Sequence, residues 1–456
     1  MDAAANPSQA SARAGWRPDS WRACETAQQP EYGDSEALEA ALSELAALPP
    51  IVTSWEVESL RQSIAAAQRG EAFVLQGGDC AETFPECTSD IIVARLKVLL
   101  QMSLVLSYGL RKPIVRVGRM AGQYAKPRSA PLESREAVSL PSFRGDLVNH
   151  ESFTSGARAP DPKLLLRGYE RAALTLNFVR SLVDGGFADL HHPENWNLDW
   201  VGHSPQAEAY EAIVDRITRS LDFIEHSTGR DLSRLRRTNF YTSHEGLLLH
   251  YEQAQTRLLP HRGVWYNLTT HFPWIGMRTA QLGGGHVEFF RGVANPMGIK
   301  IGPAMTSEWL VELLGVLNPD NQEGRITLIH RMGAGRVGEA LPPLIEAVQR
   351  QGAKVLWMCD PMHGNTETAA NGRKTRRLER IEEELDRAFA AHAKAGTWLG
   401  GVHLELTGEN VTECVGGARG LNEADLDKSY RTQVDPRLNY EQAIELAMLI
   451  SQKAVG

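Results

Sequence analysis

Short apolar runs rich in β-branched residues recur along this chain, and they alternate with stretches of helical periodicity. Amphipathic stretches such as SEWLVELLGVL (307–317) and ALPPLIEAVQRQG (340–352) lie between most of them. Eight buried parallel strands that alternate with helices predict an α/β fold, the (β/α)8 barrel. The eight runs are FVLQGG (73–78), IVRVGRM (114–120), TNFYTSHE (238–245), WYNLTTHFPWIG (265–276), GIKIGP (298–303), RITLIHR (325–331), KVLWMCD (354–360) and GVHLELTG (401–408).

The pattern divides the chain into an N-terminal extension, residues 1–70, and a catalytic barrel, residues 71–456. We expect the first dozen or so residues to be disordered and two helices to follow, DSEALEAALSELAAL with Ser35 as N-cap and WEVESLRQSIAAAQRG. Between strands 2 and 3 lie about 120 residues, far more than a barrel loop needs. Helical spacing predicts a large helical insertion there, within about 150–238, for oligomer contact or regulation.

Composition excludes several classes of protein. Hydrophobic content of 42%, charged content of 23% and an interspersed net charge of −8 are ordinary for a soluble globular protein and indicate no nucleic-acid surface. No apolar run approaches the roughly 20 residues needed to span a bilayer, and the N-terminal stretch lacks the apolar core of a secretory signal. Five cysteines, an odd and small number, favour a reducing compartment. We therefore expect a cytoplasmic protein.

Charged or ligating residues follow every predicted strand. Because the C-terminal ends of barrel strands open on one face, we expect these side chains to share one active site. The stretch FVLQGGDCAETF is of this kind, since Gly77 and Gly78 let the backbone turn or approach closely and deliver Asp79 and Cys80 to the site. In strand order the residues are Cys80, Arg119, His244 with Glu245, Arg278, Lys300, Arg331, Asp360 with His363, and Glu405.

One group at these ends has the chemistry of metal ligands: Cys80, His363, Glu405 and Asp435. A thiolate, an imidazole and two carboxylates suit manganese, cobalt, iron or zinc better than magnesium or calcium. The spacing matches no local metal-binding motif, and the alternative is that Cys80 is a small buried hydrophobic residue.

A second group is cationic: Arg119, Lys126, Arg128, Arg278, Lys300 and Arg331. Lys300 lies between two isoleucines on a predicted central strand, where an ammonium group needs an anionic partner. So many cations in an acidic protein indicate one or two polyanionic substrates. The alternative, a set of structural ion pairs, accounts for one or two of them.

Long motifs across roughly residues 20–450 give this chain a family resemblance. The motifs LQGGDCAETF, AGQYAKPRS, NFYTSHEGLLLHYE, GIKIGP, DPMHGNT, HLELTGENVTEC and DPRLNYEQAIELA resemble those of class II (plant-type) 3-deoxy-D-arabino-heptulosonate 7-phosphate (DAHP) synthases. The resemblance implies a (β/α)8 barrel and a transferase that condenses phosphoenolpyruvate with erythrose 4-phosphate and releases phosphate. This reaction is the first step of the shikimate pathway to chorismate and the aromatic amino acids.

The resemblance also implies roles for the residues above. Cys80, His363, Glu405 and Asp435 match the metal ligands, with manganese or cobalt favoured and iron or zinc as alternatives. Arg119, Lys126, Arg278, Lys300 and Arg331 match the phosphoenolpyruvate site, whereas Arg128 and Ser129 match the phosphate clamp for erythrose 4-phosphate. Lys300 is the candidate for proton transfer, with Cys80 and His363 as the other catalytic candidates. A homodimer or homotetramer is expected, and an aromatic amino acid effector and a chorismate mutase partner stay open.

The chain departs from the family pattern at four places. One is Val434, which precedes Asp435 where some members carry a cysteine, so that a disulfide from Cys80 to this position is excluded. Met277 replaces a glutamate at the phosphoenolpyruvate site that helps to orient the attacking water, His330 replaces a small hydroxyl residue, and GGGH (283–286) replaces DGAH. His330 is then the one new polar residue expected near the water. Three hypotheses for the function follow. The protein is the ordinary synthase, a secondary-metabolism paralogue that uses another aldose phosphate or an amino analogue, or a ligand-binding barrel with a regulatory role.

Overall fold

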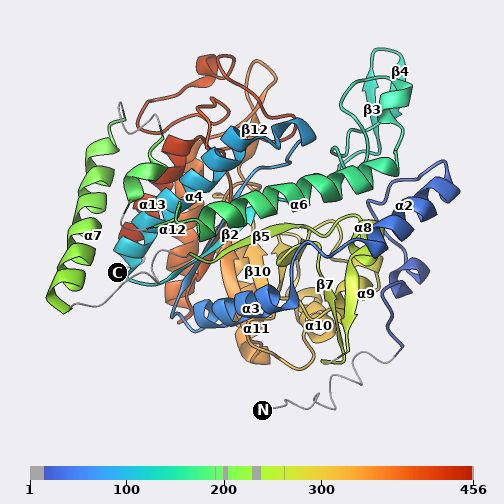
Figure 1. Cartoon of the computed structure of the whole chain (residues 1–456), viewed down its shortest axis with the longest axis horizontal. Coiled ribbons are helices and arrows are strands. Elements are labelled where there is room, and N and C mark those ends of the chain that lie inside the picture. Colours follow the sequence, from blue (N-terminus) through green and yellow to red (C-terminus); the bar gives the residue numbers. More distant parts are fainter. Residues whose placement is uncertain (1–14, 190–191, 199–203, 229–237, 261, 454–456) are drawn as a thin grey trace.

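Eight parallel strands close into a barrel at the centre of the molecule, and helices surround them (Figure 1). The computed structural model describes residues 15–189, 192–198, 204–228, 238–260 and 262–453, so the disorder expected for the first dozen residues lies outside the described part. Each strand pairs with its neighbour in the sequence order of the barrel, and the last pairs with the first. The strands are β1 (Phe73–Gly78), β2 (Ile114–Arg119), β5 (Phe240–Glu245), β8 (Phe272–Ile275), β9 (Met297–Ile301), β10 (Ile326–His330), β11 (Val355–Cys359) and β14 (Gly401–Glu405). The predicted (β/α)8 barrel is confirmed.

Alternate strand residues belong to two apolar clusters, because successive side chains of a strand point to opposite faces. One cluster contains Val74, Val117 and Ile329 and fills the barrel, whereas the other contains Leu75 and Ile299 and packs under the surrounding helices. The helix α3 (Ser54–Gln68) adds its apolar face to the inner cluster. It therefore closes the N-terminal end of the barrel and leaves the C-terminal end for a site.

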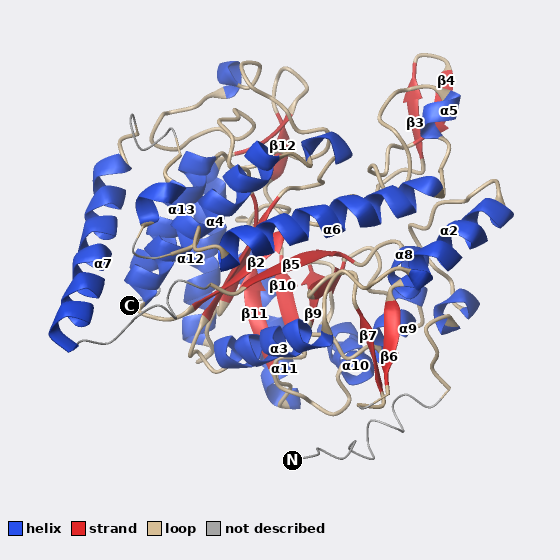
Figure 2. Cartoon of the chain, viewed as in Figure 1, coloured by secondary structure: helices blue, strands red, loops and turns tan. Residues whose placement is uncertain are grey.

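The remaining elements cover the barrel and its ends, as Figure 2 shows by colour. The other helices are α2 (Ser35–Ala47), α4 (Ser89–Leu110), α5 (Ser155–Arg158), α6 (Lys163–Asp184), α7 (Ala207–Thr228), α8 (Leu249–Ala254), α9 (Gly285–Gly292), α10 (Ser307–Leu317), α11 (Val337–Gln351), α12 (Leu378–Lys394) and α13 (Tyr440–Lys453). Short 3-10 helices are η1 (Ser20–Ala23), η2 (Phe84–Glu86), η3 (Pro193–Trp196) and η6 (Glu423–Asp425). Three two-stranded hairpins are β3 (Leu132–Arg135) with β4 (Val138–Pro141), β6 (Thr256–Leu259) with β7 (Val264–Asn267), and β12 (Thr366–Thr368) with β13 (Lys374–Arg376).

The predicted fourth strand, 265–276, is two strands. Its first part belongs to the β6–β7 hairpin, and only β8 enters the barrel. The break lies at Asn267, whose side-chain oxygen accepts the backbone N–H of Thr269 at 2.9 Å. Such a local bond stabilises a turn at the expense of an extended strand. The predicted N-cap of α2 is also off by one residue, because the carboxylate of Asp34, not Ser35, accepts the N–H of Ala37 at 2.9 Å.

The insertion between β2 and β5 contains the two expected helices, α6 and α7. It also contains the β3–β4 hairpin and α5, which helical periodicity could not indicate. The hairpin projects at the upper right of Figure 1.

One helix, α4, is long and apolar enough to span a membrane by length and composition. The expectation that no apolar run reaches this length is therefore wrong for residues 89–110. The helix packs against β1, β2 and α13, and most of its apolar window is buried. These contacts are those of a core helix in a soluble protein.

Candidate active site

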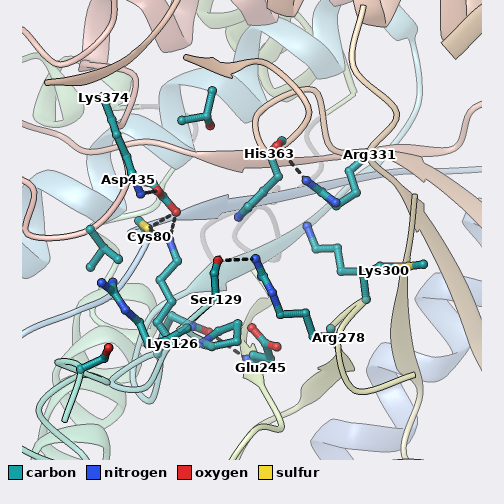
Figure 3. A pocket seen from close by; sticks show the side chains of 18 of the residues that line it. Cys80, Lys126, Ser129, Glu245, Arg278, Lys300, Arg331, His363, Lys374 and Asp435 are labelled. Carbon is teal, nitrogen blue, oxygen red and sulfur yellow. Dashed lines mark hydrogen bonds and ion pairs between the residues drawn. The ribbon is translucent and has the colours of Figure 1, made fainter. Parts of the chain in front are cut away.

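A cavity of about 440 Å³ opens at the C-terminal end of the barrel. Figure 3 shows side chains from several barrel strands and loops that converge on it. All six cations that the sequence singles out line it: Arg119, Lys126, Arg128, Arg278, Lys300 and Arg331. Cys80, Ser129, Met277, His363 and Asp435 line it too, and Glu405 lies directly behind, in contact with His363. The structure thus brings together the residues that the family resemblance assigns to the metal and the two substrates. His244 was also expected there but does not line the cavity, and its Nε2 is 2.8 Å from Oε1 of Glu252.

Cys80 reaches the cavity because β1 ends in a glycine that no other residue could replace. Gly78 has φ of +145°, and a Cβ there would lie 2.6 Å from the carbonyl oxygen of Arg119. The close approach expected of this glycine is therefore confirmed. Asp79 does not enter the cavity, contrary to expectation. Its buried carboxylate pairs instead with Arg95 and, at 2.6 Å, with Arg437, which fixes the strand end from below.

The four predicted metal ligands converge. The sulfur of Cys80 and carboxylate oxygens of Glu405 and Asp435 all lie within 4.8 Å of one another. The Nε2 atom of His363 is 3.1 Å from Oε1 of Glu405. The other nitrogen, Nδ1, is 2.7 Å from Oδ2 of Asp360, a contact that fixes the ring and directs Nε2 toward the cluster.

Cations surround these ligands and offset their charge. The ammonium group of Lys126 contacts both the sulfur of Cys80 and the carboxylate of Asp435, and Nη2 of Arg119 is 3.1 Å from Oε1 of Glu405. Burial alone would raise the pKa of Glu405, but the charges of His363, Lys126 and an arginine outweigh it and hold this pKa well below its usual range.

Two basic residues of this side were missed by sequence reasoning. Nη2 of Arg376 is 2.7 Å from Oε2 of Glu405, and Nζ of Lys374 is 2.9 Å from Oδ1 of Asp435. Both come from the β12–β13 hairpin. The basic run GRKTRR (372–377) was the available signal, but it does not indicate which of its side chains turn inward.

Sulfur, nitrogen and oxygen donors together suit a divalent ion that is intermediate between hard and soft. Burial, together with the neighbouring Glu405 carboxylate, raises the pKa of the Cys80 thiol to about 12. A thiol in these surroundings becomes a thiolate only with a strong positive charge beside it, which a divalent ion supplies.

The opposite side of the cavity carries cations without carboxylate partners. Within the described ranges, neither Arg278 nor Arg331 forms an ion pair. Arg278 donates to the hydroxyl of Ser129 at 3.0 Å, and Arg331 donates to the backbone oxygen of His363 at 2.8 Å. Figure 3 shows both arginine side chains in the cavity. Guanidinium groups that pair with no carboxylate suit phosphate and carboxylate groups, which they bind in a bidentate manner.

Lys300 lies between the two sides. Only 5% of the residue is exposed, and its ammonium group contacts the carboxylate of Asp360, which also holds His363. Burial lowers the pKa of Lys300 to about 8, although Asp360 partly opposes the shift. A lysine with this pKa can bind an anion as ammonium and can also exchange a proton near neutral pH.

The surroundings of Met277 differ from the expectation. Met277 lines the cavity next to Gly276, but His330 does not line it. The His330 ring lies behind the barrel wall, beside Trp357, so it cannot hold a water there. A carboxylate is nevertheless present, because Glu245 lines the cavity and a Cβ on Gly276 would lie 2.1 Å from its Oε1. Burial raises the pKa of Glu245, while Lys300 opposes the shift.

The N-terminal segment also contributes to the site, which the sequence did not indicate. Gln28, with φ of +65°, donates from its side-chain amide to the backbone oxygen of Arg128 at 3.1 Å. Its side-chain oxygen accepts the backbone N–H of the same residue at 2.9 Å. These two bonds fix the backbone of Arg128 as a strand partner would.

Comparisons with known proteins identify the family of this chain. The model of the class-II DAHP synthetase family matches residues 16–451. A phospho-2-dehydro-3-deoxyheptonate aldolase of Neurospora crassa is 47% identical over 454 residues, which cover 96% of this chain and 94% of the relative. One of Streptomyces coelicolor is 47% identical over 95% of this chain and 96% of the relative, and one of Mycolicibacterium smegmatis is 44% identical over 96% and 94%. These likenesses run through the barrel, its insertion and the N-terminal segment, and the chain belongs to the class-II DAHP synthase family.

Proposed function

We propose that this cavity condenses phosphoenolpyruvate with erythrose 4-phosphate and releases phosphate, in the metal-dependent reaction of a DAHP synthase. The observation that carries the proposal is the division of one cavity into a ligand cluster and a set of unpaired guanidinium groups. The reaction needs these two sides next to each other, because a metal activates the aldehyde of erythrose 4-phosphate while cations bind the carboxylate and phosphate of phosphoenolpyruvate.

In this proposal phosphoenolpyruvate binds between Arg278, Lys300 and Arg331, with Arg119 and Lys126 on the metal side. The carboxylate and phosphate of this substrate take the guanidinium groups that have no carboxylate partner in the described chain. The phosphate of erythrose 4-phosphate binds at Arg128 and Ser129. The bond of 3.0 Å from Arg278 to Ser129 joins the two subsites, which supports their adjacency.

We assign the metal to Cys80, His363, Glu405 and Asp435. When bound, it would act as a Lewis acid on the aldehyde oxygen of erythrose 4-phosphate. Manganese or cobalt suits this donor set, and iron or zinc are the alternatives. Removal of the metal with a chelator should abolish activity, and added manganese should restore it.

The residues of the chain then manage charge and protons. The methylene carbon of phosphoenolpyruvate attacks the aldehyde carbon, and positive charge develops on the neighbouring carbon. Water adds to that carbon, and the resulting hemiketal phosphate expels inorganic phosphate. Glu245 is the carboxylate placed to orient the water beside Met277, and Lys300, with a pKa of about 8, can protonate the alkoxide oxygen or hold the departing phosphate.

Met277 supports a second candidate. A thioether cannot orient water or share its proton, so the site could also serve a paralogue that accepts another aldose phosphate or an amino analogue. The third hypothesis, a barrel without catalysis, is disfavoured because all four ligands converge.

Rescue of a strain that lacks its own DAHP synthase separates these candidates. Growth without aromatic amino acids is expected from this chain and not from its Cys80→Ser variant. Cys414→Ser serves as the matched control, since Cys414 is buried but neither belongs to the ligand cluster nor lines the cavity; its thiol donates to the backbone oxygen of Arg437 at 3.3 Å. A soluble chain that fails to rescue growth would favour the paralogue.

We also propose residues 1–70 as an extension of a barrel that comprises 71–456, and a cytoplasmic location, which five free cysteines support. A homodimer or homotetramer is proposed as well. Exposed large apolar side chains on α3, α6 and α7, namely Trp55, Leu174 and Phe223, support further contacts.

A further inference from the structure

A second cluster of ligating side chains lies behind the barrel wall, away from the cavity. His330 ends β10, Cys359 ends β11, and the two residues are directly paired in the parallel register of these strands. The third member, Glu384, comes from α12, which packs over this face. None of the three lines the active-site cavity. Asp360, the next residue after Cys359, faces the other way, toward Lys300.

The three side chains are arranged as ligands to one ion. Their ligand atoms lie within 4.8 Å of one another, and all three residues are fully buried. Zinc bonds to sulfur, nitrogen and oxygen of about 2.0–2.3 Å place the ligands of a tetrahedral site about 3.3–3.8 Å apart. A small contraction would therefore suffice to bind an ion.

The imidazole of His330 points independently to a missing partner. The residue is 0% exposed, and neither of its ring nitrogens finds a hydrogen-bond partner in the described chain. A neutral imidazole always has one N–H to donate and one nitrogen to accept, so burial without either bond is costly. A metal ion takes the acceptor nitrogen directly.

Glu384 is held in place for such a role. Its Oε1 accepts the backbone N–H groups of Met332 and Gly333 at 2.8 and 2.9 Å, and its Oε2 accepts the side-chain N–H of Asn365 at 2.7 Å. Within the described residues no lysine or arginine pairs with this carboxylate. Burial raises its pKa to about 7. Burial, together with the Glu384 carboxylate, also raises the pKa of the Cys359 thiol well above its usual value, although the charge of Lys300 opposes the shift.

We propose that His330, Cys359 and Glu384 bind a structural zinc ion. Sulfur, nitrogen and oxygen donors in one buried group are the chemistry of zinc rather than of magnesium or calcium. The ion would tie the ends of β10 and β11 to α12. Because Arg331 and Asp360 directly follow two of the ligands, the ion would also fix the wall from which they reach the cavity.

The surroundings supply an approach and a further nitrogen. The ring of His392 is centred 5.9 Å from that of His330, and its Nε2 also has no hydrogen-bond partner among the described residues. A separate cavity of about 440 Å³ at the N-terminal end of the barrel is lined by His392. An ion could reach the cluster from this side without passing through the active site.

Cobalt absorbance in the full-length Cys80→Ser chain tests the proposal without any measurement of activity. The active-site cluster of this variant can bind cobalt only through nitrogen and oxygen, so any sulfur-to-cobalt charge-transfer band arises elsewhere. We expect such a band, with one thiolate-bound cobalt per chain. Adding Cys359→Ser should abolish it, whereas adding Cys414→Ser, a buried thiol outside the cluster, should leave it unchanged.

A second variant decides the outcome if Cys359→Ser does not fold. His330→Ser in the same Cys80→Ser background retains the thiol but should weaken cobalt binding at least tenfold, with zinc competing for the same site. Absence of the band in the Cys80→Ser chain would overturn the proposal. So would a band that persists after Cys359→Ser, or cobalt affinity that His330→Ser leaves unchanged.

Discussion

Replacement of Lys300 by methionine tests whether the cationic side of the cavity binds phosphoenolpyruvate. Methionine retains much of the side-chain volume and removes the charge, so the barrel can still pack. Lys300 is 5% exposed and its partner Asp360 is 0% exposed, so solvent cannot replace the lost ammonium. Loss of one member of such a buried pair costs about 2–5 kcal/mol. At about 1.4 kcal/mol for each tenfold, kcat/KM for phosphoenolpyruvate should fall by roughly 30-fold to several thousand-fold.

The assay is the initial rate of phosphoenolpyruvate consumption at saturating erythrose 4-phosphate, with thermal unfolding to check the fold. Lys354→Met is the matched control, since Lys354 is 49% exposed and its Nζ pairs with Glu323 at 3.1 Å on the surface. Exposed pairs contribute about 0–1 kcal/mol, and this residue is outside the site, so its rate should stay within about twofold. If Lys300→Met folds and retains kcat/KM within threefold of wild type, the assignment of Lys300 to phosphoenolpyruvate is refuted.

Three further predictions follow from the same contacts. Because the ammonium of Lys300 loses its proton as the pH rises through about 8, kcat/KM for phosphoenolpyruvate should fall above this pH. Asp360→Asn removes a negative charge that raises the pKa of Lys300, so the fall should move to lower pH. A pH profile that does not move would contradict the pairing of Lys300 with Asp360. Gln28→Ala should raise KM for erythrose 4-phosphate several-fold with little change in kcat, and an unaltered KM would exclude the N-terminal segment from the site. Met277→Glu should raise turnover with erythrose 4-phosphate or leave it unchanged, measured as product formed, and complete loss of turnover would favour the paralogue.

The sequence predicted the barrel and the site well because both depend on local patterns. Buried strands are visible as apolar runs, and residues at their C-terminal ends must meet on one face. The break at Asn267 was not visible, because a side-chain bond to Thr269 competes with an apolar pattern that continues through it. The insertion hairpin was missed for a related reason, since its strands are short and largely exposed.

Side-chain direction was the main information that the sequence lacked. Asp79 and Cys80 are neighbours, yet one binds arginines below the strand end and the other lines the cavity. His330 was expected beside the water and lies behind the wall instead. Long-range pairing is a second gap, because nothing near Gln28 indicates that it contacts Arg128, one hundred residues later.

Product analysis with the purified, manganese-loaded chain tests the proposed reaction most directly. We expect phosphoenolpyruvate and erythrose 4-phosphate to disappear in equal amounts, and 3-deoxy-D-arabino-heptulosonate 7-phosphate and inorganic phosphate to appear in the same amounts. A chelator should stop all four changes. Parallel reactions with other aldose phosphates should be much slower. Rapid use of phosphoenolpyruvate with another aldose phosphate, and none with erythrose 4-phosphate, would refute the proposed reaction.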